Sequence, residues 1–186
     1  MKKQPEVTDK TKRAFMDAFC ELYAKKPIER ISVQEIANSA GYNRSSFYQH
    51  FCDIYELLDY LESYVLASML PKQHDNKTSI QDFLLPNKEM SFYLNTLFGE
   101  YGGNHFLERL KTVIPYEAHK LSLPKDDPLS PYLLEFHLST VLSLFRLWYQ
   151  KDKDLSQEEL FGLIHNLYTK GVSAVRRTKT LDSVVL

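Results

Sequence analysis

Two short helix signals on either side of one glycine constrain the fold of this chain more than any other feature of its sequence. Ser32 and Glu35 have the spacing of a capping box, in which the two side chains satisfy backbone groups at a helix start. Gly41 can adopt the left-handed conformation that ends a helix, and Asn43 is of a type that caps the next one. The pattern predicts a short helix, a tight glycine turn and a second short helix over residues 44–51, which is a helix-turn-helix arrangement.

Helix start and stop signals also recur through the rest of the 186 residues. Asp53 and Glu56 repeat the capping-box spacing, and Ser130 precedes a proline. No segment shows the period of two that marks a half-buried strand, and no repeat of about 20–50 residues is visible. We therefore predict an all-α fold. The expected helices cover residues 8–25, 32–40, 44–51, 53–70, 87–101, 104–120 with a kink at Pro115, 130–151, and 156–174 behind a third capping box and ending near Gly171, while residues 71–86 are left unassigned.

The composition fits a globular chain, with 44% hydrophobic residues and near-balanced charges that give a net charge of -1. The average hides an asymmetry. Residues 1–52 carry nine basic and six acidic residues, a net charge of +3, and the remainder carries -4. A basic N-terminal region on an acidic body is expected where only that region meets a polyanion, although so small a difference is also compatible with chance.

The sequence offers no sign of secretion, of a membrane span or of a metal site. The N-terminus lacks the apolar stretch of a signal peptide. The apolar segment 132–149 contains Glu135, His137 and Arg146, each costly in a lipid-facing helix, so a buried helix of a soluble protein is the better interpretation. The cysteines and the C-terminal histidines have no metal-ligand spacing. We expect a cytoplasmic protein with no metal, no cofactor and no membrane partner.

The segment 31–58, ISVQEIANSAGYNRSSFYQHFCDIYELL, resembles the DNA-binding domain of the TetR/AcrR family of bacterial transcriptional regulators. The resemblance implies an N-terminal three-helix helix-turn-helix DNA-binding domain over residues 1–52, followed by a helical effector-binding and dimerisation domain over residues 53–186. Most of the matching apolar residues would form the core between the short helices and the first helix. Twelve positions match the family pattern in register: Ile31, Val33, Ile36, Ala37, Ala40, Gly41, Ser46, Phe47, Tyr48, His50, Phe51 and Leu57.

The same resemblance implies that the second short helix enters the major groove of DNA with its N-terminal residues against base edges. Arg44 is the leading candidate to read a base, because its guanidinium can form two hydrogen bonds to guanine, and a phosphate contact is its alternative role. Tyr42 replaces a small residue of the family and either reaches DNA or covers the turn. Ile54 stands where the family usually has a lysine that contacts the DNA backbone, a loss for which basic residues near the N-terminus could compensate. The base-reading candidates are Tyr42, Arg44, Ser45 and Gln49, and the phosphate-binding candidates are Ser46, Tyr48, His50 and, through the backbone amide that follows it, Ser32.

The C-terminal part resembles the regulatory and dimerisation half of the same family. Residues 92–111 and the helix that contains Trp148 look similar to the branch that includes the dihydroxyacetone kinase activator, which works through a partner protein. By this resemblance the last two helices pair with their copies in a dimer, although a core within one chain explains most of the same residues. A two-fold dimer would place its recognition helices about 34–36 Å apart and bind a palindromic operator. The interface candidates are Leu134, Leu138, Val141, Phe145, Leu160, Ile164, Leu167 and Tyr168, with Leu142, Trp148 and Leu163 on the same faces.

Together these patterns predict a sequence-specific DNA-binding transcriptional regulator. We expect a homodimeric repressor that a small apolar or aromatic effector releases from a palindromic operator. An activator or co-regulator whose C-terminal domain docks a protein partner is the alternative. An all-α enzyme is disfavoured, because there is no nucleophile–base motif, no glycine-rich phosphate loop and no telling pair of carboxylates. The candidates for an effector pocket, for which ordinary core packing is the alternative, are Tyr64, Phe92, Phe106, Phe136 and Trp148.

Overall fold

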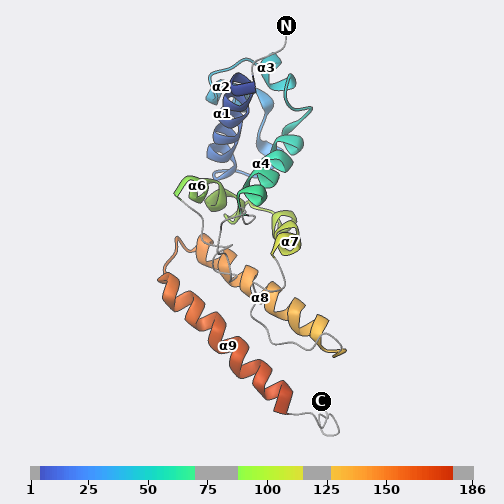
Figure 1. The fold of residues 1–186 in the computed structure, drawn as a ribbon. Coiled ribbons are helices and arrows are strands. Elements are labelled where there is room, and N and C mark those ends of the chain that lie inside the picture. Colours follow the sequence, from blue (N-terminus) through green and yellow to red (C-terminus); the bar gives the residue numbers. More distant parts are fainter. Residues whose placement is uncertain (1–4, 70–87, 115–126, 178–186) are drawn as a thin grey trace. The chain divides into compact units, whose positions relative to one another are not determined.

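The computed structural model describes residues 5–69, 88–114 and 127–177, with side chains for residues 8–69, 90–114 and 127–170. All regular elements in these ranges are helices, so the predicted all-α class is confirmed (Figure 1). The chain divides into two compact units, Met1–His119 and Lys120–Leu186. The first unit contains α1 (Pro5–Tyr23), a 3-10 turn (Ile28–Arg30), α2 (Val33–Ser39), α3 (Arg44–Tyr48), α4 (Ile54–Met69), α6 (Lys88–Leu97) and α7 (Asn104–Val113), and the second contains α8 (Ser130–Gln150) and α9 (Gln157–Arg177).

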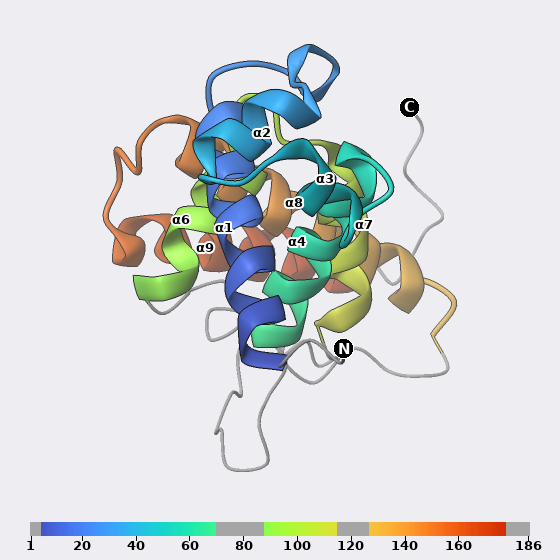
Figure 2. The ribbon, with the colours of Figure 1, turned by 90° about the horizontal axis from the view of Figure 1, so that it is seen from above.

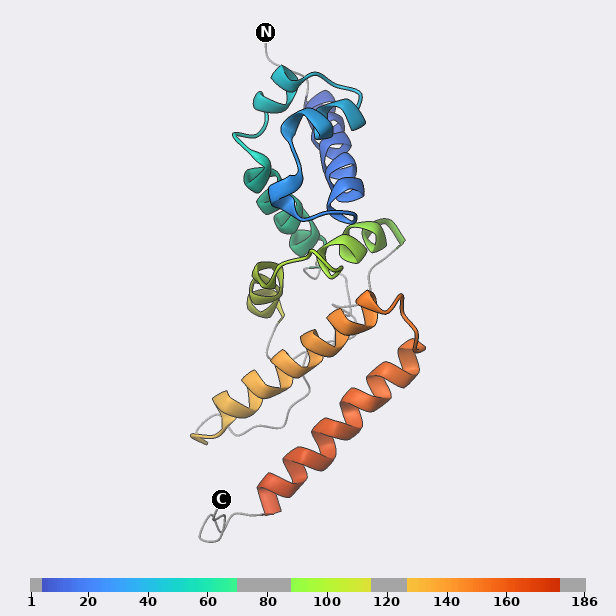
Figure 3. The same ribbon diagram turned by 180° about the vertical axis from the view of Figure 1, so that it is seen from behind.

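The first compact unit continues well beyond the functional boundary predicted at residue 52. Within it, α2 and α3 lie toward one end of α1 and α4, whereas α6 and α7 lie toward the other end (Figures 1 and 3). A change of function at residue 52 therefore stays a prediction that the compactness of the chain does not test. The unassigned segment 71–86 and the predicted helical residues 115–120 lie outside the described residues.

An aromatic core holds α1, α2 and α3 together. Phe15 and Phe19 lie four residues apart on α1, as the helical period predicts, and both are fully buried with Ile36 of α2 and Phe47 of α3. The ring of Phe15 lies 5.4 Å from that of Phe47 and 6.4 Å from that of Phe51, in the edge-to-face orientation that aromatic pairs favour. Viewed from above, α2, α3 and α4 gather around α1 (Figure 2). The predicted three-helix core is therefore present.

The turn between α2 and α3 follows the predicted chemistry. The Glu35 N–H donates to Ser32 Oγ at 3.2 Å, and the Ser32 N–H donates to Glu35 Oε2 at 2.9 Å, which completes the capping box. Gly41 has φ +75°, in the left-handed region that glycine adopts without steric cost. The following Tyr42 N–H donates back to the Ala37 carbonyl at 2.9 Å, so α2 ends in a closed loop of backbone hydrogen bonds.

The helix that follows is shorter than expected, because α3 ends at Tyr48 and not near residue 51. Its last turn tightens: the N–H groups of His50 and Phe51 both donate to the Phe47 carbonyl, at 2.9 and 3.0 Å. Asn43 is the N-cap residue, but its side chain makes no capping bond to the backbone. Its Oδ1 atom accepts the hydroxyls of Ser45 at 3.4 Å and Ser46 at 3.3 Å instead. The predicted cap position is correct and its predicted chemistry is wrong.

The end of α6 and the start of α7 differ from the prediction because of close backbone packing. α6 ends at Leu97 rather than at residue 101. A Cβ atom on Gly102 would lie 2.0 Å from the Leu97 carbonyl oxygen, so the chain folds back onto the end of this helix where only glycine fits. α7 has Gly103 as its N-cap residue, and Asn104, the predicted cap, is its first helical residue.

The other bounds differ by a few residues. α1 covers residues 5–23 instead of 8–25. α8 takes Leu129 as its N-cap, with Ser130 as its first residue and proline within the first two positions. α9 continues through Gly171 to Arg177, so the expected stop near that glycine is wrong. Glycine in a helix interior costs only about 1 kcal/mol relative to alanine, which the rest of a long helix can offset.

A polar cluster, which we call the Glu62 cluster, joins α4 to α7. The Glu62 side chain is 3% exposed, and its Oε2 atom accepts from Arg109 Nη1 at 2.9 Å and lies 2.8 Å from His105 Nδ1. Arg109 also donates to Asp59 Oδ1 and to Ser63 Oγ, each at 2.6 Å. A buried carboxylate is tolerated only where charged and hydrogen-bonding partners surround it, and this cluster supplies both.

Two tyrosine hydroxyls tie α1 to the segment around α6. Tyr93 donates to Asp17 Oδ1 at 2.6 Å, and Tyr23 donates to the Tyr101 carbonyl at 2.6 Å. Burial and the neighbouring Asp17 carboxylate raise the pKa of the Tyr93 hydroxyl, which therefore stays a proton donor at neutral pH. The helices that carry the helix-turn-helix are thus bonded to the rest of the first unit.

The second unit is an antiparallel hairpin of α8 and α9 (Figures 1 and 3). Trp148 organises its turn, because its indole N–H donates to the Leu155 carbonyl at 2.8 Å. Asp152 and Lys153 adopt the left-handed conformation, with φ of 52° and 59°. The Lys153 ammonium lies 4.3 Å from the ring centre of Tyr149, a cation–π contact that offsets part of this strain.

Candidate nucleic-acid interface

The exposed side of α3 carries three of the four predicted base-reading residues. Arg44, Ser45 and Gln49 are exposed, whereas Phe47 on the other side of the helix is fully buried. Tyr42 is half-buried, with its ring 5.3 Å from that of Phe15 and its hydroxyl 3.5 Å from that of Thr11. Of the two roles open to Tyr42, this placement favours covering the turn.

Arg44 and Tyr48 contact each other one turn apart along α3. Arg44 Nη2 donates to the Tyr48 hydroxyl oxygen at 3.0 Å, and Arg44 Nε lies 3.4 Å from the same oxygen. The guanidinium carbon lies 5.4 Å from the centre of the Tyr48 ring. The leading base-reading candidate and a phosphate-binding candidate therefore form one unit, which the sequence analysis treated as two independent residues.

The remaining phosphate-binding candidates are half-buried at the same end of the first unit. The Ser46 hydroxyl donates to Asn43 Oδ1, and the His50 ring lies 6.3 Å from that of Phe15 and 6.4 Å from that of Phe51. Contacts of this kind fix the position of a side chain while leaving part of it exposed. Ser46 and His50 are thus held in place near the exposed side of α3.

Ser32 lies in the predicted capping box with Glu35. Its N–H and its hydroxyl both donate to Glu35 Oε2, at 2.9 Å. The Lys26 ammonium lies 2.6 Å from the other carboxylate oxygen, and these partners lower the pKa of Glu35 to about 2. The Glu35 carboxylate accepts from the donors of Ser32 itself, and a phosphate contact through the backbone amide that follows Ser32 stays a prediction.

Comparison with known proteins identifies this part of the chain. Residues 15–61 match the model of the family described as bacterial regulatory proteins, tetR family. That range includes α2, α3 and the first half of α4. These residues are similar to the N-terminal domain of TetR-family regulators. The predicted resemblance is confirmed, and so is the helix-turn-helix domain that it implied.

Individual proteins agree with the family match. A protein of Haemophilus influenzae described as an uncharacterized HTH-type transcriptional regulator is 46% identical over 50 residues, which cover 26% of this chain and 24% of that protein. The chain thus spans about a quarter of the length of this relative. The solved structure of the dihydroxyacetone kinase operon activator DhaS aligns over 88% of this chain and 97% of its own, with a TM-score of 0.52 and 17% identity. At that identity the similarity concerns the fold alone.

The TetR family consists of transcription regulators that bind operator DNA and usually dimerise, and it is generally not enzymatic. Lys12 and Arg13 are two of the basic residues near the N-terminus that could compensate for the missing lysine, and both contact tyrosines of α4. The Lys12 ammonium lies 4.5 Å from the ring centre of Tyr60, and Arg13 Nη2 donates to the Tyr64 hydroxyl at 3.2 Å. These pairs join α1 to α4 across about fifty positions of sequence. No local motif predicts contacts at that separation.

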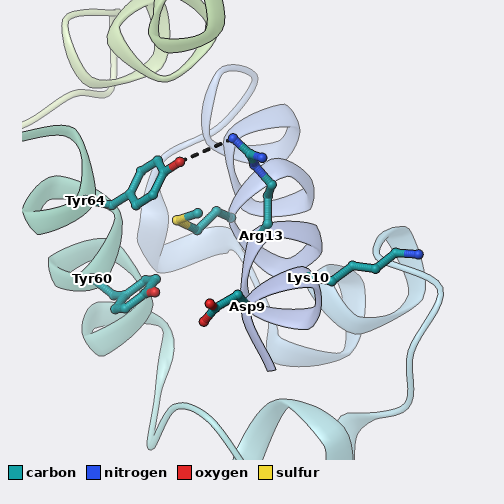
Figure 4. Close-up of a pocket in the computed structure, with 6 residues that line it drawn as sticks. Asp9, Lys10, Arg13, Tyr60 and Tyr64 are labelled. Carbon is teal, nitrogen blue, oxygen red and sulfur yellow. Dashed lines mark hydrogen bonds between the residues drawn. The ribbon is translucent and has the colours of Figure 1, made fainter. Parts of the chain in front are cut away.

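The five predicted pocket residues are not gathered around one cavity in the described parts of the chain. Tyr64 lines a hollow of about 500 Å³ between α1 and α4, together with Asp9, Arg13 and Tyr60 (Figure 4). Trp148 lines a smaller hollow of about 260 Å³ in the second unit. Phe106 is sealed in the core against Phe98, and both Phe92 and Phe136 are exposed. An effector pocket formed by these five residues stays a prediction.

The predicted interface residues of α8 and α9 fall on both sides of the hairpin. Five of them are buried within the structure: Leu138, Val141, Phe145, Leu160 and Ile164. Leu134 and Tyr168 are half-buried, and Leu167 is 51% exposed. Leu163 and Leu167 on α9 share this exposure with three α8 residues that the sequence analysis did not assign to an interface: Tyr132, Phe136 and Leu147. The pattern of apolar residues did not distinguish a buried side of α8 from an exposed one, because this helix is apolar over most of its circumference.

The described residues contain no group of three or more histidine, cysteine or acidic side chains that could hold a metal ion. No helix among them is long and apolar enough to cross a membrane.

Proposed function

We propose that the chain is a homodimeric, sequence-specific DNA-binding repressor that acts in the cytoplasm on a palindromic operator. The observation that carries this proposal is the placement of Arg44, exposed at the first position of α3 in a TetR-type helix-turn-helix. An arginine at the start of a recognition helix can reach the O6 and N7 atoms of guanine in the major groove. Ser45 and Gln49 share its exposed side and complete the base-reading set.

Ser46, Tyr48 and His50 are the residues we assign to phosphate contacts. Their hydroxyl and imidazole donors suit phosphate oxygens, and their fixed positions near the exposed side of α3 support this role. Glu35 accepts from the N–H and hydroxyl of Ser32, so only the backbone amide that follows Ser32 stays a phosphate candidate. We assign Tyr42 to support of the turn, because its ring packs against that of Phe15.

For the dimer we propose the exposed apolar strip on the α8–α9 hairpin. Its members Tyr132, Phe136, Leu147, Leu163 and Leu167 are 44% to 75% exposed, and large apolar side chains at this exposure are costly unless a partner covers them. A second copy offers the same strip about a two-fold axis, which is how most homodimers close. Five of the originally predicted interface residues are left out of this strip because they are buried: Leu138, Val141, Phe145, Leu160 and Ile164.

Release by a small apolar or aromatic effector is the mode of regulation we propose. The hollow of about 260 Å³ beside Trp148, lined mostly by leucines, supports an apolar ligand. A second candidate is an activator whose C-terminal part docks a protein partner, as the fold similarity to a protein named as an operon activator suggests. In a reconstituted transcription assay, a repressor lowers transcription by itself, whereas this second candidate changes it only with the partner present.

DNA binding is tested by measuring affinity for the chain's own upstream DNA and for random duplex at several salt concentrations. We expect a preference for the upstream DNA and a linear fall of log affinity with log salt. Arg44→Ala should reduce discrimination at one base pair by about 1–3 kcal/mol, whereas His50→Ala should weaken binding to all sequences alike. A folded wild-type protein that binds both duplexes equally would refute the proposal.

A further inference from the structure

The Arg44 guanidinium is held from one side before any DNA arrives. Its Nε and Nη2 atoms both point to the Tyr48 hydroxyl oxygen, at 3.4 and 3.0 Å. These two atoms form one edge of the planar guanidinium, and the edge formed by Nη1 and Nη2 is a separate one. The Tyr48 oxygen therefore binds the Nε–Nη2 edge of the guanidinium and leaves the Nη1–Nη2 edge available to a second acceptor.

Tyr48 is itself anchored. Its ring lies 5.7 Å from that of Phe47 in an edge-on orientation with an interplanar angle of 88°. Phe47 is fully buried and packs against Phe15 of α1, so the tyrosine ring rests on a residue of the core. An exposed arginine on a five-residue helix would otherwise sample many rotamers.

We infer that Tyr48 is a positioning residue for base recognition: it holds Arg44 so that the Nη1–Nη2 edge faces a guanine. Two parallel N–H donors on that edge match the O6 and N7 acceptors of guanine. This inference rests on the proposed DNA-binding function and adds a role to the phosphate contact assigned to Tyr48. The two roles are compatible, because the hydroxyl accepts from Arg44 and can still donate its own proton to a phosphate.

The two roles have different signatures in a binding experiment. A phosphate contact contributes equally to every sequence, whereas positioning of Arg44 contributes only where a guanine is present to be read. Because a rotamer-rich side chain costs about 0.5–1.5 kcal/mol to immobilise, loss of the positioning should lower the preference for guanine by about 2- to 13-fold.

The experiment first selects preferred duplexes with the wild-type full-length chain and identifies the guanine whose replacement Arg44→Ala no longer detects. Tyr48→Phe should then lower the affinity ratio between the guanine duplex and the substituted duplex by about 2- to 13-fold. In the Arg44→Ala background the same change should leave that ratio unaltered. Tyr55→Phe is the matched control, because Tyr55 is 57% exposed and removing its hydroxyl should leave the ratio as in wild type.

A measurement without DNA separates this inference from the proposed function. In free protein labelled with ¹⁵N-arginine, the Arg44 Nε–H should exchange with water more slowly in wild type than in Tyr48→Phe, because the hydrogen bond to the hydroxyl is lost in the variant. Equal exchange in both proteins, or a Tyr48→Phe variant that weakens all duplexes by one factor, would overturn the inference. A wild type without base preference, but with protected Arg44 exchange, would refute the proposed function and the base-reading role together while leaving the Arg44–Tyr48 pair intact.

Discussion

Replacement of Gly41 by alanine should destabilise the helix-turn-helix through backbone strain alone. Gly41 has φ +75°, and a Cβ atom built there would meet nothing within 4 Å. No steric collision contributes, so the left-handed conformation itself sets the cost, about 1–2 kcal/mol for an L-residue. Alanine also lowers the conformational entropy of the unfolded chain, which stabilises the folded state by about 0.4–1 kcal/mol. The net loss should be about 1 kcal/mol.

Gly162→Ala is the matched control with the opposite expected sign. Gly162 lies within α9, and an added Cβ atom there also meets nothing within 4 Å. In a helix interior alanine is more favourable than glycine by about 0.8–1.0 kcal/mol. The same chemical change should therefore stabilise one unit and destabilise the other.

The two effects can be read separately, because the only tryptophan, Trp148, lies in the second unit. Its fluorescence during urea unfolding should report the gain from Gly162→Ala. Hydrogen exchange of the Tyr42 amide, which is bonded to the Ala37 carbonyl at 2.9 Å, should report the loss from Gly41→Ala. If folded Gly41→Ala protein protects this amide as well as wild type does, the assigned role of the left-handed turn is wrong.

Three further predictions follow from other parts of the structure. Glu62→Ala should cost about 2 kcal/mol of unfolding free energy, less than for an isolated buried pair because Arg109 keeps its bond to Asp59; an unchanged urea midpoint would contradict it. The pKa of Glu35 is lowered from 4.5 to about 2, so its stabilising contribution is complete above about pH 4.5 and is lost as pH falls toward 2, which a carboxyl NMR titration checks; a midpoint near 4.5 would refute the capping geometry. Phe136→Glu, at a side chain 59% exposed, should leave the fold intact and shift the proposed dimer toward monomer in analytical ultracentrifugation, whereas an unaltered dimerisation constant would remove this strip from the interface.

Local chemistry made the helix-turn-helix predictable. The Ser32–Glu35 box and the Gly41 turn involve residues that lie at most a few positions apart, so their spacing alone defines the hydrogen bonds. Spacing did not predict the partners of Asn43. Its side chain accepts from two nearby hydroxyls and not from the backbone. Residues of this type choose between local partners of similar strength, and spacing does not reveal the choice.

Pairings between distant segments could not be predicted in the same way. Glu62 and Arg109 are 47 positions apart, and Tyr93 and Asp17 are 76 apart, so no motif links either pair. Helical periodicity also did not predict which side of α8 is buried. Phe136 and Val141 are both apolar, but Phe136 is exposed and Val141 is buried. A periodic pattern distinguishes the two faces of a helix only when one of them is polar.

These long-range bonds also explain why the compact unit does not end where the TetR-type match does. The match ends at residue 61, one position before the buried carboxylate that binds Arg109. α4 therefore extends past the end of the match: Leu57 and Leu61 are buried within the matched residues, and Glu62 is the first residue beyond them. α4 begins six positions after the last residue of α3, and its other half carries the Glu62 cluster. Since a helix is stiff over sixteen residues, we expect a displacement of α7 that strains this cluster to reach the start of α4.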